Sequence, residues 1–119
     1  IITAFSCFRI KVPIVTLYAT LGVDALAFGI NQTSAQYLFT NGEQLPKLQK
    51  ILSKIKNITT IVVFDDKYTE NYLAEFKKNC PSSIRVQTMS EIETIGKENP
   101  IVDNYTRPTK DDLAIIMYT

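Results

Sequence analysis

The chain contains 119 residues, of which 45% are hydrophobic and 21% are charged, a composition that suits one globular domain or part of one and excludes intrinsic disorder. Its 13 basic and 12 acidic residues give a formal net charge of +1, so no charge excess exists to drive sequence-independent binding to nucleic acid or to an acidic membrane surface. The absence of histidine and the presence of only two cysteines, Cys7 and Cys80, exclude histidine-dependent catalysis and a cysteine-rich zinc site within this segment.

Short β-rich runs alternate with amphipathic helical patterns from the start of the chain. The first residues, through about Ile10, are compatible with the end of a helix. After Pro13, the β-branched and aromatic run from Ile14 to Tyr18 predicts a buried strand. Beyond Gly22, apolar residues recur at helical spacing and predict a helix built on Val23, Leu26, Ala27 and Ile30.

A second strand and the clearest helical pattern follow. Residues 36–40 predict the strand, and the turn dipeptide Asn41-Gly42 ends it. The helix has Pro46 in its first turn, and its apolar face consists of Leu45, Leu48, Ile51, Leu52 and Ile55. The lysines between Lys47 and Lys56 fall on the opposite side, which predicts a solvated face rather than a binding patch.

The middle of the chain contains a strand that is apolar throughout. Residues 60–64 predict a strand buried on both sides, and Asp65-Asp66 closes it. We then expect Thr69 to cap a helix that stops near Cys80-Pro81.

The last third predicts a short strand, a short helix and a final strand. Residues 84–87 predict the short strand, and Ser90 with Glu93 fits a capping box for a helix that ends at Gly96. After a polar surface connection, residues 113–118 begin a strongly apolar strand. This order of elements predicts an α/β fold with a mostly parallel sheet and flanking helices, and it leaves the strand order open.

Open α/β sheets place ligands at the carboxyl ends of their strands, and the candidates there are Ala19-Thr20-Leu21-Gly22, Asp65-Asp66 and whatever follows Thr119. The carboxylates of Asp65-Asp66 could hold Mg²⁺, but a polar strand end leading into a turn is the favoured interpretation. Asp111-Asp112 receives the same interpretation, because it precedes a strand and the starts of strands lie opposite the usual ligand site. Tyr18 could stack on a ligand, although a core tyrosine is the more common outcome. Gly22 and Gly29 complete no phosphate-binding motif.

Two stretches near the first strand carry a more specific pattern. Residues 15–22 have the sequence VTLYATLG, and Ala25, Gly29-Ile30-Asn31 and Thr33 fit A-x-x-x-G-[IL]-N-x-T. Both stretches resemble animal-type long-chain fatty acyl-CoA synthetases. Val23-Asp24 and Phe28 depart from what is usual in that family, and both lie on the predicted helix.

The end of the chain carries a second resemblance. Residues 111–119 resemble the strand that leads into the signature Y-T-S-G-S-T-G-x-P-K-G of adenylate-forming enzymes, of which Tyr118 and Thr119 are present. The two resemblances together cover nearly the whole chain. They imply that residues 1–119 are part of the N-terminal, AMP-binding domain and stop immediately before the phosphate-binding loop.

This resemblance implies an ATP-dependent ligase that acts in two steps. The carboxylate of a long-chain fatty acid attacks the α-phosphate of ATP to give an acyl-adenylate and pyrophosphate, and the thiol of coenzyme A then displaces AMP. ATP, Mg²⁺ and coenzyme A are therefore implied for the parent enzyme, as is a location on the cytosolic face of the endoplasmic reticulum or another intracellular membrane. Thr119 is the one residue implied to contact the nucleotide, while no catalytic or metal-binding residue is assigned. The isolated chain is expected to be inactive and poorly soluble.

Two other interpretations stay open at this point. One is a ligase for another carboxylic acid, shorter or aromatic. The other is a non-catalytic α/β binding module that is secreted and glycosylated at the N-x-[ST] triplets of Asn31, Asn57 and Asn104, although such triplets also arise by chance in a chain of this composition. Glycans on these asparagines would favour the module, whereas free Cys7 and Cys80 would favour the ligase.

Overall fold

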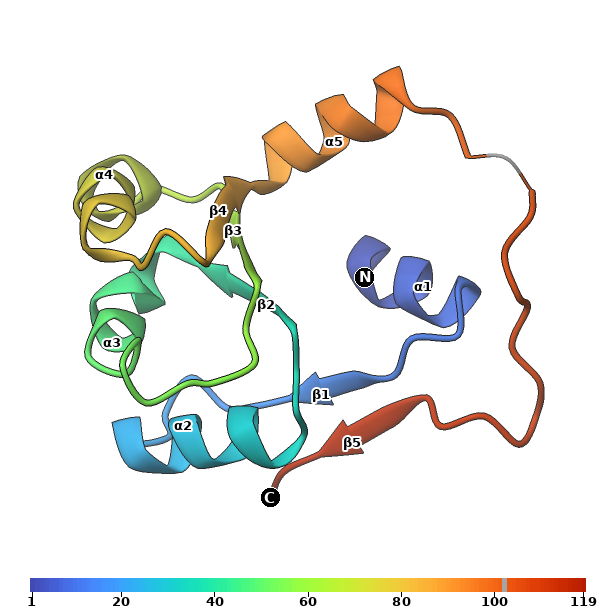
Figure 1. The fold of residues 1–119 in the computed structure, drawn as a ribbon, viewed down its shortest axis with the longest axis horizontal. Helices are drawn as coiled ribbons and strands as arrows, with labels where there is room; N and C mark the ends of the chain where they lie inside the picture. Colours follow the sequence, from blue (N-terminus) through green and yellow to red (C-terminus); the bar gives the residue numbers. More distant parts are fainter. Residues whose placement is uncertain (102) are drawn as a thin grey trace.

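The computed structural model describes residues 1–101 and 103–119, which form two parallel sheets with flanking helices (Figure 1). This architecture confirms the predicted α/β class. Within the described residues, the regular elements in chain order are α1 (Ile2–Arg9), β1 (Ile14–Thr16), α2 (Val23–Gln32), β2 (Tyr37–Asn41), the 3₁₀ turn Gly42–Gln44, α3 (Leu45–Gln49), β3 (Thr60–Phe64), α4 (Thr69–Asn79), β4 (Arg85–Thr88), α5 (Met89–Glu98) and β5 (Ile115–Met117).

The strands divide between two sheets instead of forming one. Strands β2, β3 and β4 are parallel neighbours in that order, with Tyr37 opposite Thr60 and Thr60 opposite Arg85. Strand β1 pairs with β5, from the far end of the chain, with Thr16 opposite Met117. Figure 1 shows this second pair lying apart from the other three strands, with α2 beside it.

The core lies where the three-stranded sheet meets α2, α3 and α4. Strand β3 is buried as its apolar run predicts, and Ile61 and Val63 are fully inaccessible to solvent. The side chains that pack around them are contributed by the helices and by the turns after α3, and the largest are Ile30, Leu45, Ile51 and Phe76. Burial of such side chains contributes roughly 1.5–3 kcal/mol each, which makes this cluster the main source of cohesion.

The helix predicted through Ile55 is shorter than its apolar pattern suggests. Helix α3 ends at Gln49, and the chain continues in tight turns closed by bonds from Ile51 N to Leu48 O (2.9 Å) and from Lys54 N to Ile51 O (2.8 Å). These bonds span three residues, as in a 3₁₀ turn, so the apolar side chains stay on the core side while the helical pitch is lost. All five predicted core residues are buried.

The capping box of α5 lies two residues earlier than predicted. The Thr88 hydroxyl accepts a bond from Glu91 N (3.2 Å), and the Glu91 carboxylate accepts one from Thr88 N (2.7 Å). Strand β4 therefore runs into α5 without a loop, because its last residue is also the helix cap. The helix continues past Gly96 to Glu98, so this glycine does not end it.

Strand β1 is shorter and less buried than predicted. It ends at Thr16, and its residues are partly or fully exposed. Strand β5 alternates between exposed and partly buried residues, and Met117 is 62% exposed. Helix α1 contacts β1, and α2 contacts the residues that follow β1 and β5. No helix in the described ranges is both long enough and apolar enough to cross a bilayer.

Asn31 ties the end of α2 to the turns after α3. Its side-chain Nδ2 donates to Lys54 O (2.8 Å), and its Oδ1 accepts from Lys56 N (3.0 Å). We predict that Asn31→Ala weakens the local stability of α2 by about 1–2 kcal/mol, because both bonds are lost. Amide hydrogen exchange within α2 measures this change.

The control is Asn57→Ala, which removes an exposed amide that makes no side-chain hydrogen bond to the described residues. This variant should stay within about 0.5 kcal/mol of wild type. Equal protection of α2 in the two variants would contradict the proposed role of Asn31.

Candidate functional site

The carboxyl ends of β1 and β5 lie side by side and form the candidate site. The backbone N–H of Tyr118 donates to the carbonyl of Thr16 across the sheet (3.4 Å). Tyr18 and Thr119 both follow this last point of pairing, and both are exposed. The structure therefore brings the end of the VTLY run next to the Tyr118-Thr119 pair, as expected for ligand-binding residues of a parallel sheet.

Helix α2 packs closely beneath this edge because it has a glycine at the contact. A Cβ atom placed on Gly29 would lie 2.7 Å from Leu17 Cδ2 and 3.7 Å from Tyr118 Cζ. The hydroxyl of Tyr118 also donates to Oε1 of Gln32 on the same helix. Packing on one side of the ring and a hydrogen bond at its tip together fix Tyr118, and hence the direction in which the chain leaves β5.

The A-x-x-x-G-I-N-x-T pattern has a structural role at each of its last four fixed positions. Gly29 allows the close helix contact, Ile30 is 2% exposed in the core, and Asn31 holds the turns after α3. The Thr33 hydroxyl donates to the carbonyls of Gly29 (3.0 Å) and Ile30 (3.2 Å). These four residues therefore support the site through packing and hydrogen bonds within the chain.

Two lysines of the predicted solvated face instead contact the region between β1 and α2. The Lys47 ammonium donates to the carbonyls of Ala19 and Leu21, the latter at 3.2 Å. Lys54 forms an ion pair with Asp24 at the start of α2 (2.6 Å). The hydrogen bond and the charge of Lys54 lower the pKa of Asp24. The periodicity placed these lysines opposite the core correctly, but it gave no sign that another segment lies there.

Tyr18 is a surface residue rather than a core tyrosine. Its side chain is 56% exposed, because β1 ends at Thr16 and the chain turns away from the sheet. Tyr18 borders a mainly apolar hollow of about 340 Å³, lined further by Val15, Leu17, Ala19, Leu26, Leu38, Phe39, Thr40, Asn41, Gln44, Leu48 and Phe64. The favoured interpretation of this tyrosine was therefore wrong, and its ring is available to a ligand.

The Asp65-Asp66 pair is held by hydrogen bonds within the chain. Asp65 accepts bonds from the N–H (3.2 Å) and the hydroxyl (2.6 Å) of Ser90, which joins the end of β3 to α5. Asp66 accepts from Tyr68 N (2.9 Å) and from the Thr69 hydroxyl (3.0 Å). Thr69 is thus the first residue of α4 and not its cap, because the Asp66 carboxylate already binds the N–H groups there. These contacts support the turn interpretation.

Partial burial raises the pKa of Asp66, but the bonds from Tyr68, Thr69 and the backbone of Glu43 outweigh it, and the net pKa is lower than usual. Gly42 allows this approach, since a Cβ there would lie 2.5 Å from Asp66 Oδ1 and 2.6 Å from Thr69 N. Asp66 therefore ties the end of β2 to the start of α4.

Asp112 has a similar role at the opposite, amino end of β5. It accepts from Thr109 N (2.7 Å) and pairs with Lys11 (3.0 Å), and these bonds lower its pKa. Lys11 adopts a left-handed conformation (φ 63°) just after α1, where its N–H bonds to Phe8 O and that of Val12 bonds to Cys7 O. This is a Schellman ending with lysine at the usual glycine position. The ion pair of this lysine with Asp112 connects the end of α1 to the start of β5.

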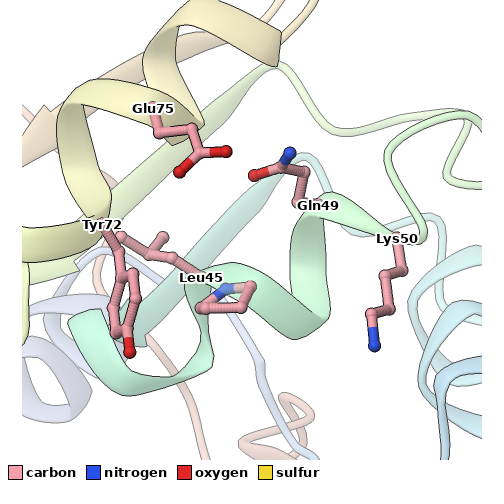
Figure 2. A pocket seen from close by; sticks show the side chains of 6 residues that line it. Leu45, Gln49, Lys50, Tyr72 and Glu75 are labelled. Atoms are coloured by element: carbon pink, nitrogen blue, oxygen red, sulfur yellow. The ribbon is translucent and has the colours of Figure 1, made fainter.

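Other features of the described residues offer no second site. Figure 2 shows a surface depression between α3 and α4 in which Gln49 and Glu75 point toward each other, while Lys50 points away. It lies on the helices and not at the strand ends. Cys7 and Cys80 are unpaired, and burial raises the pKa of both thiols, which disfavours a thiolate nucleophile. Within residues 1–101 and 103–119, no group of three potential metal ligands occurs.

The residues at this edge could supply only part of the hydrogen bonds and positive charge that a nucleoside triphosphate requires. The Thr119 side chain is an exposed hydroxyl at a strand end, which suits a hydrogen bond to a phosphate oxygen. The last seven residues contain no lysine or arginine, so the positive charge that phosphates need must come from other groups. A parallel sheet with exposed polar residues at the carboxyl ends of its strands places the chain in the class of α/β proteins that bind ligands at such an edge.

Comparison with known proteins specifies the family. The protein family described as "AMP-binding enzyme" matches residues 1–119, so the chain belongs to this family. It is 33% identical to Long chain acyl-CoA synthetase 8 of Arabidopsis thaliana over 113 residues, covering 95% of this chain and 15% of that protein. It is 30% identical to Long-chain-fatty-acid--CoA ligase 1 of Saccharomyces cerevisiae over 120 residues, covering 91% of this chain and 17% of that protein. The chain thus spans about one sixth of the length of these relatives.

Solved structures of adenylation domains share the fold. The adenylation domain of a carboxylate reductase from Mycobacterium chelonae aligns with a TM-score of 0.79 at 16% identity, covering 94% of this chain and 18% of that one. The A domain of the carboxylic acid reductase from Segniliparus rugosus, solved with AMP and a co-purified carboxylic acid, aligns with a TM-score of 0.80 at 17% identity, covering 98% and 20%. The two-sheet arrangement is therefore that of an adenylation domain.

The contact at Gly29 leads to a prediction about stability. We expect Gly29→Val to be more destabilising than Gly96→Val by about 1–3 kcal/mol, because only the first valine meets Leu17 and Tyr118. The control makes the same change within a helix, where an added Cβ meets open space. Urea unfolding of the full-length gene product tests the difference, and equal losses would show that α2 does not pack as described.

The depressed pKa of Asp66 predicts acid sensitivity. Its stabilising contribution is complete above the unfolded pKa of about 3.9 and is lost as pH falls through the lower folded pKa. We expect Asp66→Asn to be less stable than wild type at neutral pH and to lose less stability between about pH 4 and pH 2. The melting temperature measured as a function of pH tests this, with Asp111→Asn as a control at an exposed carboxylate. An unchanged acid limb in Asp66→Asn would refute the role of Asp66.

Proposed function

We propose that the full-length gene product is a long-chain fatty acid–CoA ligase. In this reaction the fatty acid carboxylate attacks the α-phosphate of ATP, which forms the acyl-adenylate and releases pyrophosphate. The thiol of coenzyme A then attacks the acyl carbon, which forms the thioester and releases AMP. The observation that carries the proposal is the adjacency of the VTLYATLG segment and the Tyr118-Thr119 end of β5, in a chain whose relatives are named as long-chain acyl-CoA synthetases.

Within this proposal, Thr119 contacts the nucleotide phosphates. Its hydroxyl is exposed at the carboxyl end of β5, and the fixed ring of Tyr118 determines where the following residues begin. A glycine-rich continuation would add backbone N–H donors, and a lysine would add positive charge, which together suit phosphate oxygens. Mg²⁺ would neutralise phosphate charge when bound, and we assign none of its ligands to this chain.

The proposal extends to organisation and location. Residues 1–119 would form part of the N-terminal AMP-binding domain, with the phosphate loop immediately after Thr119. The enzyme would act on the cytosolic face of the endoplasmic reticulum or of another intracellular membrane. Family resemblance alone supports this location.

A second candidate is a ligase that activates another carboxylic acid through the same adenylate. The fold likeness to adenylation domains of carboxylic acid reductases favours it, because the Segniliparus rugosus domain was solved with a carboxylic acid and AMP. The non-catalytic binding module has no comparable support, and the engagement of the Asn31 amide in two hydrogen bonds argues against a glycan there.

Pyrophosphate exchange into ATP tests the proposal and separates the two candidates. We expect the full-length gene product to catalyse exchange that depends on a long-chain fatty acid, and to form the CoA thioester when coenzyme A is added. Exchange with short or aromatic acids only would favour the second candidate. A transcript that reads Ser-Gly-Ser-Thr-Gly after Thr119 would support both, whereas a stop codon there and no exchange would remove both.

The role of Thr119 gives a residue-level prediction. Thr119→Ala should reduce kcat/KM for ATP by about tenfold, corresponding to ~1.4 kcal/mol, because one hydroxyl contact to phosphate is lost. Thr119→Ser keeps the hydroxyl and should retain most of the activity. Thr106→Ala, at an exposed threonine elsewhere in the chain, serves as the control. Wild-type kinetics for Thr119→Ala would exclude the contact.

A further inference from the structure

We propose that Lys47 is a positioning residue that fixes the loop between β1 and α2 beside the nucleotide end of β5. This inference rests on the proposed function. Lys47 lies in α3, yet its ammonium donates to the carbonyls of both Ala19 and Leu21, which are more than twenty residues earlier in the chain. A single side chain thus binds two backbone groups of one short loop.

Few hydrogen bonds other than those of Lys47 hold the exposed part of this loop. Residues 17–22 contain one internal backbone hydrogen bond, from Leu21 N to Tyr18 O (3.1 Å), and Gly22 begins α2 without a side-chain cap. Ala19 and Thr20 are exposed, so packing does not fix them. Leu17 anchors the start of the loop on the core and Leu21 is partly buried, whereas Lys47 binds the backbone on both sides of the exposed part between them.

The position of this loop matters because it directly follows the pairing of β1 with β5. Thr16 accepts the last hydrogen bond, from Tyr118 N, and both strands then diverge. A displaced loop would move Tyr18 relative to Thr119, and with it the edge along which a nucleotide lies. Lys47 would thus act through the loop, without contacting the nucleotide itself.

Lysine suits this role because its ammonium carries three donors on a flexible stem. Arginine keeps the charge and several donors, so it can restore the two bonds. Methionine has a similar length without any donor and leaves both carbonyls to water. Lys50, in the same part of the chain, is exposed and makes no side-chain hydrogen bond or ion pair to the described residues, which makes it a matched control.

The test compares Lys47→Met, Lys47→Arg and Lys50→Met with wild type in the full-length gene product. The first readout is the amide hydrogen exchange of Leu21 without ligand, because its N–H donates to Tyr18 O inside the loop. This readout does not require activity. We expect about tenfold faster exchange in Lys47→Met, because the bonds from a charged donor are lost, and near wild-type exchange in the other two variants. Unchanged exchange in Lys47→Met would overturn the inference.

The second readout is fatty-acid-dependent exchange of pyrophosphate into ATP. Lys47→Met should raise the KM for ATP by about three- to tenfold while the KM for the fatty acid stays within twofold, and Lys47→Arg should restore the former. A loss confined to kcat, or one that arginine does not rescue, would assign Lys47 a merely structural role and overturn the inference. Inactivity of the wild-type protein would instead count against the proposed function, while the loop readout still decides whether Lys47 holds residues 19–22.

Discussion

The close contact of α2 with the ends of β1 and β5 is the constraint on which the rest of the site depends. Two strands from opposite ends of the chain make a sheet too small to hold itself, so they need a partner that covers one face. Gly29 lets the α2 backbone reach Leu17 and Tyr118, and the bond between Tyr118 and Gln32 fixes the same ring. The direction in which the chain leaves β5, and therefore the position of Thr119, follows from this contact.

The segment from Lys47 to Lys56 holds that helix at both ends. Lys47 and Lys54 bind the loop before α2 and its first turn, while the backbone around Lys54 and Lys56 binds Asn31 near the end of the helix. The individual bonds are modest, and solvent screens the exposed ion pair between Lys54 and Asp24. Together they hold α2 against Leu17, Tyr118 and the core, which gives the A-x-x-x-G-I-N-x-T pattern a structural role on this helix.

Much of the fold follows from local patterns, whereas the site depends on long-range geometry. The apolar run of β3 and the helical spacing of α2 and α4 identify their elements, because burial and periodicity are local properties. The pairing of β1 with β5 leaves no local signal, and neither do the carbonyls that Lys47 binds. Two local signals misled: the apolar spacing after Leu45 continues through 3₁₀ turns, and Ser90 with Glu93 imitates the box that Thr88 and Glu91 form. The family assignment came from specific strings of residues and not from composition.

We propose that the carboxyl ends of β1 and β5 form the edge at which the full-length gene product binds its nucleotide. Amide hydrogen exchange of the full-length gene product, with and without ATP, tests it directly. The account predicts that ATP slows exchange at residues 18–22 and 117–119, while α5 and the amino end of β5 stay unchanged. Protection elsewhere with no change at these two segments would contradict it, because the nucleotide would then bind away from the edge that α2 supports.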